Sequence, residues 1–408
     1  MTLKFNADQL LYNTTEGDCF LYQLEPDDKT KQRMNEIKLT IRNKIRSAFK
    51  DAHSLLETSG LKVLSERYQF SMEDFSLFSE NQSDAVEAFK SVNPKFRSQG
   101  SKVYGTLNSP AQTPPQEMDI DDGVYLPMSL FNDQGPVIAK NIFFKIVDTA
   151  LKDLCREQGW EFKQKNTCAR INIPGEPLHF DTPLYAIPDK KHTAMTASME
   201  SFDTASLSFA EIVLDPSEVY LAIRDETHWK ASDPKVVSDW FTDEIECHKS
   251  KLTRACRYLK AWRDHNWPDG PISSLALMVC AVKTFNTPGV KPSNQSEALL
   301  EVAARLPDQL REGVILPVNG EPIYPRPQDT AYQADAIAKA EEFKEQIHTA
   351  LLSAFSPNES LAAFKAVFGN RIPNNASLIS LNSNPVREAP AIRQASPEKN
   401  IPKQAISG

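Results

Sequence analysis

The sequence has 408 residues, of which 40% are hydrophobic and 25% are charged, and these shares are typical of a globular protein rather than a disordered one. The length is enough for two or three domains. Its 54 acidic and 46 basic residues leave a net charge of −8, which disfavours a protein dedicated to binding duplex nucleic acid. The net charge does not exclude nucleic-acid binding, because an acidic protein can still contain a local basic cleft.

The sequence contains no signal for export or membrane insertion. Its first residues have neither a basic region nor the apolar run of a signal peptide, and no apolar run approaches about 20 residues. The six cysteines form no C-x-x-C pair and have no histidine at zinc-binding spacing. We therefore expect a soluble, cytoplasmic protein whose thiols are reduced and mostly buried.

The first half of the chain alternates helix and strand signals. Apolar residues from Met34 to Leu56 recur every three or four positions, which predicts one long helix over residues 27–57, capped by Asp27 or Asp28. A second helix is predicted near 137–157. A period of two predicts strands over Glu117–Leu126, Thr167–Pro174 and Leu178–Ile187. This order indicates a mixed α/β layer domain, which we place at residues 1–234.

The second half of the chain has a helical apolar period. The clearest stretch is Val236–Trp267, and further helices are predicted over Ile272–Phe285, Gln295–Leu306, Ala331–Phe355 and Glu359–Phe368. We therefore expect a helical domain over residues 235–375. Residues 384–408 contain four prolines and no aromatic residue, which is typical of a disordered tail.

Two aspartates in the first predicted strand are candidates for binding a metal. Asp119 and Asp121 are two residues apart, so their side chains leave the same face, while Met118 and Ile120 face the core. Two like charges held side by side repel each other unless a cation lies between them, and a hard divalent ion such as Mg²⁺ or Mn²⁺ prefers carboxylate ligands. A D-x-D pair alone is weak evidence, since many surface strands carry one by chance.

A glycine-serine pair lies about twenty residues before these acids. Gly100 lets the backbone approach a phosphate closely, and the start of a short predicted helix offers free N–H donors. Gly100 and Gly105 have the spacing of a P-loop, but Thr106 stands where that loop needs a lysine, which excludes the P-loop. A site for two metal ions needs a third carboxylate. Asp181, in an otherwise apolar strand, is the best candidate, and an exposed acid on an edge strand is the alternative.

These blocks together resemble the bacterial cGAS/DncV-like nucleotidyltransferases, and among them the DncV-type cyclic dinucleotide synthases. The resemblance covers most of residues 1–375 and rests on QGSKVYGTLN, QEMDIDDGVYLPM, TCARINI, HFDTPLYAIP, CRYLKAWRDHNW and GPISSLALM. The glycine-serine pair and the D-x-D pair alone would indicate only the wider polymerase-β-like superfamily. The resemblance implies a polymerase-β-like α+β core with a long N-terminal helix, and a C-terminal helical domain that closes the nucleotide cleft.

The resemblance also implies roles for single residues. Three catalytic aspartates would bind two Mg²⁺ ions, with Mn²⁺ as the alternative, and the third would help to activate a ribose hydroxyl: Asp119, Asp121 and Asp181. Seven residues would contact nucleotides, with Tyr104 stacking on a base: Gln99, Gly100, Ser101, Tyr104, Arg170, Lys260 and Ser274. Without the resemblance, the sequence would favour a snorkelling lysine at Lys260 and an ordinary serine at a helix start at Ser274. We interpret His179 as a packing or hydrogen-bonding residue rather than a base.

The resemblance implies that the enzyme uses ATP and GTP and makes 3′,3′-cyclic GMP-AMP, which activates a separate effector in bacterial anti-phage defence. In some of these systems ubiquitin-pathway-like enzymes conjugate the C-terminus of the synthase, here Gly408, whereas the alternative is an ordinary frayed end. Two other functions remain open. A template-free RNA polymerase would need a basic groove, and an inactive interaction protein would have been free to lose its repelling acids.

Overall fold

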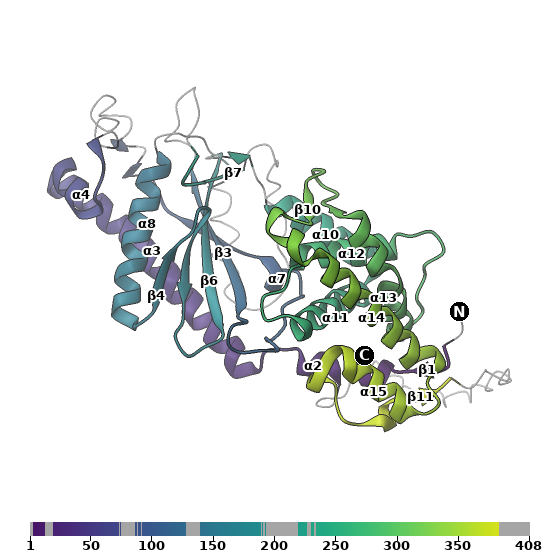
Figure 1. Ribbon diagram of the computed structural model, residues 1–408. Coiled ribbons are helices and arrows are strands. Elements are labelled where there is room, and N and C mark those ends of the chain that lie inside the picture. The colour runs from purple at the N-terminus through teal and green to yellow at the C-terminus, as the bar shows by residue number, and fades with distance from the viewer. Residues whose placement is uncertain are drawn as a thin grey trace, which may run out of the picture.

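The structure is a computed structural model that describes residues 3–12, 19–72, 74, 86–87, 89–90, 92–127, 139–188, 190, 192, 219–226, 230–231 and 234–382. Two lobes lie side by side (Figure 1). One lobe is a mixed sheet with helices packed on it, and the other is a bundle of helices. The predicted α+β fold, with a long N-terminal helix, is confirmed.

The main strands of the sheet lie in the order β2 (Lys95–Gln99), β3 (Met118–Pro127), β6 (Leu178–Ile187), β5 (Cys168–Asn172) and β4 (Glu161–Gln164). The short strands β7 (Tyr220–Leu221) and β8 (Lys230–Ala231) extend from β6. Strands β3 and β6 run parallel, and the other pairs are antiparallel. Because β6 lies between β3 and β5, Asp181 is on a central strand and not on an edge.

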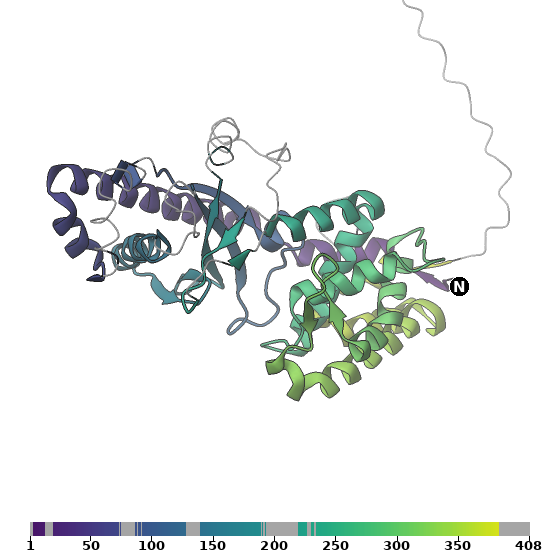
Figure 2. The same ribbon diagram turned by 90° about the horizontal axis from the view of Figure 1, so that it is seen from above.

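One face of the sheet is covered by α3 (Asp28–Thr58) and α8 (Ala139–Gln158), and α4 (Gly60–Tyr68) packs on these two helices at the end away from the helical lobe (Figures 1 and 2). The predicted apolar stripe of α3 is buried against strand residues such as Ile120, Val124 and Phe180. The side chain of Asp27 accepts a hydrogen bond from the Thr30 N–H and caps α3. The opposite face of the sheet therefore remains for polar groups.

A buried ion pair fixes α3 to strand β3. Arg42 donates two hydrogen bonds of 2.6 Å to Asp122, and Ser98 donates a third to the same carboxylate. Asp122 points to the helix-covered face, opposite to its neighbours Asp119 and Asp121. Asp122 is thus structural.

Removing this carboxylate should destabilise the protein. We expect Asp122→Asn to cost about 3–5 kcal/mol, because it leaves the Arg42 guanidinium buried without its partner charge. The control is Glu157→Gln, which breaks the exposed pair with Lys44 and should cost about 0–1 kcal/mol. Chemical denaturation followed by circular dichroism measures both. Equal shifts in the two variants would contradict the structural role of Asp122.

The second lobe is built mainly from helices, whose bounds are α10 (Pro234–His248), α11 (Ser250–Asn266), α12 (Ser274–Phe285), α13 (Gln295–Glu312), α14 (Gln333–His348), a π-helical turn (Thr349–Ser353) and α15 (Pro357–Phe368). Short 3₁₀ turns lie at Pro327–Tyr332, Gly369–Arg371 and Ala376–Leu378, and strands β9 (Val314–Ile315) and β10 (Pro322–Tyr324) form a hairpin. The stretch predicted over Val236–Trp267 is two helices. Lys249 has φ of 59°, and this left-handed backbone ends one helix before the next begins.

The N-terminal residues pack in the helical lobe. Strand β1 (Phe5–Asn6) pairs with β11 (Ser380–Leu381), and helices α1 (Asp8–Leu11) and α2 (Phe20–Gln23) join the same apolar core. Phe20 stacks on Tyr258 of α11 with ring centroids 5.5 Å apart. This packing differs from the expected division at residue 234, which placed the N-terminus with the sheet. We propose that residues 3–12, 19–24 and 234–382 form one unit. Among the described residues, no helix combines the length and apolarity needed to cross a membrane.

Candidate active site

The open face of the sheet brings the three predicted aspartates together. The parallel register of β3 and β6 places Asp119 opposite His179 and Asp121 opposite Asp181. Because side chains alternate along a strand, all four point to the same face. One ligand atom each from Asp119, His179 and Asp181 lie within 4.8 Å of one another. This cluster is where the sequence expected a metal site.

The carboxylates of this cluster repel one another. Burial raises the pKa of Asp121 to about 7, and the negative charges of Asp119 and Asp181 add to this rise. Burial opposes ionisation of Asp119 too, but the hydrogen bond and charge of a protonated His179, together with the charges of Arg170 and Lys260, outweigh burial and lower the pKa of Asp119. Carboxylate oxygens held at this spacing fit a hard divalent cation, which would compensate their charge.

Arg170 pairs directly with one of these acids. It lies opposite Asp181 in the antiparallel register of β5 and β6 and donates two hydrogen bonds, of 2.7 and 2.6 Å, to the two carboxylate oxygens. The sequence predicted Arg170 as a phosphate contact. In the structure its guanidinium fixes the rotamer of Asp181 and compensates part of the negative charge of the site.

The glycine-serine turn lies against Asp121. Strand β2 ends at Gln99, opposite Asp121, and α7 (Gly100–Val103) begins at the next residue. Gly100 has φ of +68°, and a Cβ there would overlap Oδ2 of Asp121 and lie 3.2 Å from its Cγ. Only glycine tolerates both the positive φ and the close approach of Asp121. The chain can therefore bring Ser101 beside the acids.

Gln99 is held by two tyrosines. Its Nε2 donates to the Tyr125 hydroxyl at 2.8 Å, and the Tyr185 hydroxyl donates to its Oε1 at 3.2 Å. Gly123 on β3 leaves the space for this side chain, since a Cβ there would lie 2.5 Å from the Gln99 Nε2. The side chain that precedes the glycine-serine turn is therefore immobilised.

Tyr104, which was predicted to stack on a base, follows α7. Its ring makes an edge contact with Phe241 of α10, with centroids 5.7 Å apart. Gln99 and Tyr104 both line a small pocket that also includes Tyr125 and Ser238. This pocket lies between the sheet and α10, beside the glycine-serine turn and not over the carboxylates.

Lys260 is buried in α11 and reaches the glycine-serine turn from the helical lobe. Its Nζ donates a hydrogen bond of 2.6 Å to the Thr106 carbonyl, and the Thr106 N–H donates to the Ser101 carbonyl. Burial lowers the pKa of Lys260 to about 8, and the charge of Arg263 acts in the same direction. The ammonium thus supports the turn that carries Ser101.

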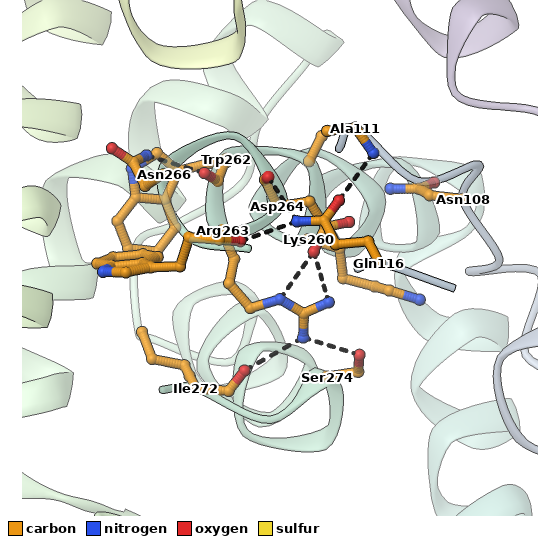
Figure 3. Close-up of polar contacts among 12 residues, drawn as sticks. Asn108, Ala111, Gln116, Lys260, Trp262, Arg263, Asp264, Asn266, Ile272 and Ser274 are labelled. Carbon is orange, nitrogen blue, oxygen red and sulfur yellow. Dashed lines mark hydrogen bonds and ion pairs between the residues drawn. The ribbon is translucent and has the colours of Figure 1, made fainter. Parts of the chain in front are cut away.

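Ser274 begins α12, but the cap of this helix is its neighbour. The Ser273 hydroxyl accepts a hydrogen bond from the Ala276 N–H, whereas the Ser274 hydroxyl accepts one of 3.0 Å from Arg263. The Arg263 guanidinium also contacts Asp264, and it ties the end of α11 to the start of α12 (Figure 3).

The loop between the glycine-serine turn and β3 is anchored to the end of α11. Gln116 donates to the carbonyls of Asp264 and Trp267, each at 2.8 Å, and accepts from the N–H groups of Ala111 and Gln112 (Figure 3). These bonds satisfy carbonyls that a helix end leaves without intrahelical partners. They also fix the position of the helical lobe relative to the strand that carries Asp119.

Two polar residues of the site were not assigned to it from the sequence. His179 was interpreted as a packing or hydrogen-bonding residue, and its ring does form a hydrogen bond, but to Glu117, which received no role. In the structure the His179 ring lies between Glu117 and Asp119. His179 and Asp181 are two residues apart, so they lie on the same face of one strand, and this spacing was a signal for the placement of His179. The signal could be used only with the knowledge that β3 lies beside β6. Gly408 lies outside the described residues.

Metal binding at this site should release protons below neutral pH. A folded protein whose Asp121 has a pKa of about 7 holds a proton there at pH 6, and a bound cation must displace it. We expect the affinity for Mg²⁺ to rise by about tenfold per pH unit up to about pH 7 and then level off. Calorimetry in two buffers of different ionisation enthalpy counts the protons. No release at pH 6 would contradict the raised pKa.

The paired aspartates, the third aspartate on the adjacent parallel strand and the glycine-serine turn define a nucleotidyltransferase. Residues 94–185 match the family model described as "Cyclic GMP-AMP synthase DncV-like, nucleotidyltransferase domain", and residues 249–381 match "Cyclic GMP-AMP synthase, C-terminal domain".

Known relatives are similar to this chain over nearly its whole length. Cyclic GMP-AMP synthases of Vibrio cholerae and Escherichia coli TW11681 are each 32% identical, in alignments covering 100% and 97% of this chain and 100% and 98% of theirs. The Vibrio cholerae DncV structure with the linear intermediate 5′ pppA(3′,5′)pG matches with a TM-score of 0.78 and 32% identity, over 94% of this chain and 100% of that one. The chain belongs to the DncV-like nucleotidyltransferase family and is an enzyme of the cyclic GMP-AMP synthase type, which confirms the resemblance.

Proposed function

We propose that the enzyme joins ATP and GTP into 3′,3′-cyclic GMP-AMP by two rounds of nucleotidyl transfer in one site. The observation that carries this proposal is the position of Asp119, Asp121 and Asp181 on adjacent strands, beside the turn of Gly100 and Ser101. Support also comes from relatives that are cyclic GMP-AMP synthases over their full length, and from the linear dinucleotide intermediate in one of their structures.

Asp119, Asp121 and Asp181 would hold two Mg²⁺ ions, with Mn²⁺ as the alternative. The donor set fits, because its oxygens are mutually repelling carboxylates and the proton on Asp121 is displaceable near neutral pH. The ions would stabilise the charge that develops on the phosphate oxygens.

In each round a ribose hydroxyl attacks the α-phosphate of a nucleoside triphosphate. A phosphodiester bond forms, the bond between the α- and β-phosphates breaks, and pyrophosphate leaves. Asp181 accepts the proton of the hydroxyl, and the bidentate pair with Arg170 keeps its carboxylate oriented toward the site. Positioning of the two nucleotides supplies much of the remaining rate enhancement.

The nucleotides would be held by groups from both lobes. Gly100 and Ser101 contact the triphosphate of the donor, with Gln99 adjacent and Tyr104 stacking on a base. Arg170, Lys260 and Ser274 complete the phosphate contacts. In the structure Lys260 also supports the turn that carries Ser101, and Ser274 accepts a hydrogen bond from Arg263.

The product would act through a separate effector that binds cyclic dinucleotides, in bacterial anti-phage defence. We further propose that Gly408 is a conjugation site for ubiquitin-pathway-like enzymes. Deleting Gly408 should abolish conjugate bands on a denaturing gel, and unchanged bands would contradict that role.

Incubation with labelled ATP, GTP and Mg²⁺, followed by phosphatase treatment and chromatography, tests the main proposal. We expect a phosphatase-resistant product that comigrates with 3′,3′-cyclic GMP-AMP and is cut by an enzyme specific for 3′–5′ linkages. Extension of an added RNA primer would instead indicate a template-free polymerase. A complete lack of product would contradict the enzymatic proposal.

A further inference from the structure

A histidine in the site is polarised by a carboxylate outside the predicted metal ligands. Nδ1 of His179 lies 2.8 Å from Oε2 of Glu117. An ionised glutamate can only accept hydrogen bonds, so the ring nitrogen that faces it carries the proton. The other nitrogen, Nε2, faces Asp119.

This nitrogen points at the predicted metal-binding carboxylates. Nε2 is buried in a ring that is 9% exposed, and it lies 2.9 Å from Oδ1 of Asp119. Although the two atoms are close, Nε2 has no hydrogen-bond partner of normal geometry. Two electron-rich atoms face each other here, and they repel unless a proton or a cation lies between them.

A cation bound by both atoms removes this conflict. Adjacent ligand atoms on an octahedral ion with bonds of about 2.1 Å lie about 3 Å apart, which is the spacing of Nε2 and Oδ1. An oxygen of Asp181 completes a group whose atoms lie within 4.8 Å of one another. Histidines that bind metals almost always donate their other N–H to a carboxylate or a carbonyl, as His179 does to Glu117.

We propose that His179 is a nitrogen ligand of one of the divalent ions, next to Asp119 and Asp181, and that Glu117 orients its ring as an outer partner. This inference rests on the proposed function, because it needs a divalent ion in the site. It gives the site a mixed ligand set in place of carboxylates alone. An imidazole favours transition metals over Mg²⁺, whose preferred ligands are oxygens. The site should therefore prefer Mn²⁺ to Mg²⁺ more strongly than three carboxylates would.

The test uses Mn²⁺ as the probe, with the full chain and a non-hydrolysable GTP analogue. Electron spin echo spectroscopy detects the ¹⁴N of an imidazole bound directly to Mn²⁺. We expect a ¹⁴N modulation in the wild type and its loss in His179→Asn. The matched control is His53→Asn, which removes another imidazole whose Nε2 also has no hydrogen-bond partner, and it should keep the signal.

Affinities provide a second measurement. Glu117→Gln should weaken Mn²⁺ binding by roughly 10–100-fold, the usual effect of losing the outer partner of a metal-bound histidine. His179→Asn should weaken Mn²⁺ binding more than Mg²⁺ binding, measured by competition. If Mn²⁺ binds to the wild type without ¹⁴N modulation, a proton rather than a metal lies between His179 and Asp119, and this inference is overturned while the proposed function stands. If neither Mn²⁺ nor Mg²⁺ binds with the nucleotide, both are overturned.

Discussion

Asp121→Asn is expected to lower the rate of nucleotidyl transfer by roughly 10³-fold, while the protein stays folded. Asp121 lies beside Asp181 in the sheet register and against the turn of Gly100, which we propose holds the triphosphate. A metal ion contributes several kcal/mol of charge stabilisation, and about 4 kcal/mol corresponds to this factor. Single-turnover assays at saturating nucleotide measure the effect.

The same substitution should stabilise the metal-free protein. Asp121 has an ordinary pKa of 3.8 when unfolded and about 7 when folded. Between these values the unfolded chain has lost the proton that the folded chain keeps, so stability falls as the pH rises from about 4 to about 7. Asparagine removes that penalty, and the gain in Tm should be larger at pH 8 than at pH 5. An inactive variant with a lowered Tm at pH 8 would point to misfolding instead.

Gly100→Ala should reduce activity by at least about 100-fold. The new Cβ would overlap the Asp121 carboxylate, so either the carboxylate or the turn that carries Ser101 must move. A displacement near 1 Å at the reacting groups is enough for such a loss. Assays of product formation and of nucleotide binding would separate a displaced metal site from a lost phosphate contact.

The control for Gly100→Ala is Gly159→Ala. Gly159 has nearly the same φ, +70°, but a Cβ there meets nothing within 4 Å. Both variants bear the cost of a left-handed alanine, about 1–2 kcal/mol, and only the first collides with the site. If both variants lose activity equally, backbone strain rather than contact with Asp121 is the cause.

The sequence predicted the acids of the site because strand geometry is local. A period of two places Asp119 and Asp121 on one face and Asp122 on the other, and the structure has them so. The placement of Asp181 beside them depends on the parallel pairing of β3 and β6 across more than fifty residues. The family resemblance implied that the three acids act together, and periodicity could not.

Other features depended on contacts that no local pattern carries. The first residues carry apolar side chains that could pack on either lobe, and their long-range contacts, such as the pairing of β1 with β11, decide which lobe they join. The break between α10 and α11 at Lys249 could not be predicted either. The helical apolar period continues across it, and a lysine gives no signal for a left-handed backbone. The cap of α12 is Ser273 rather than Ser274, and single-residue boundaries of this kind are set by hydrogen bonds at the helix end.

The central claim is that three aspartates hold divalent ions against a nucleotide triphosphate. The most direct measurement is anomalous diffraction at the manganese edge, from crystals of the full chain grown with Mn²⁺ and a non-hydrolysable GTP analogue. We predict two anomalous peaks bounded by Asp119, Asp121 and Asp181, next to the triphosphate at Ser101. A bound triphosphate with no peak at these three carboxylates would contradict the claim.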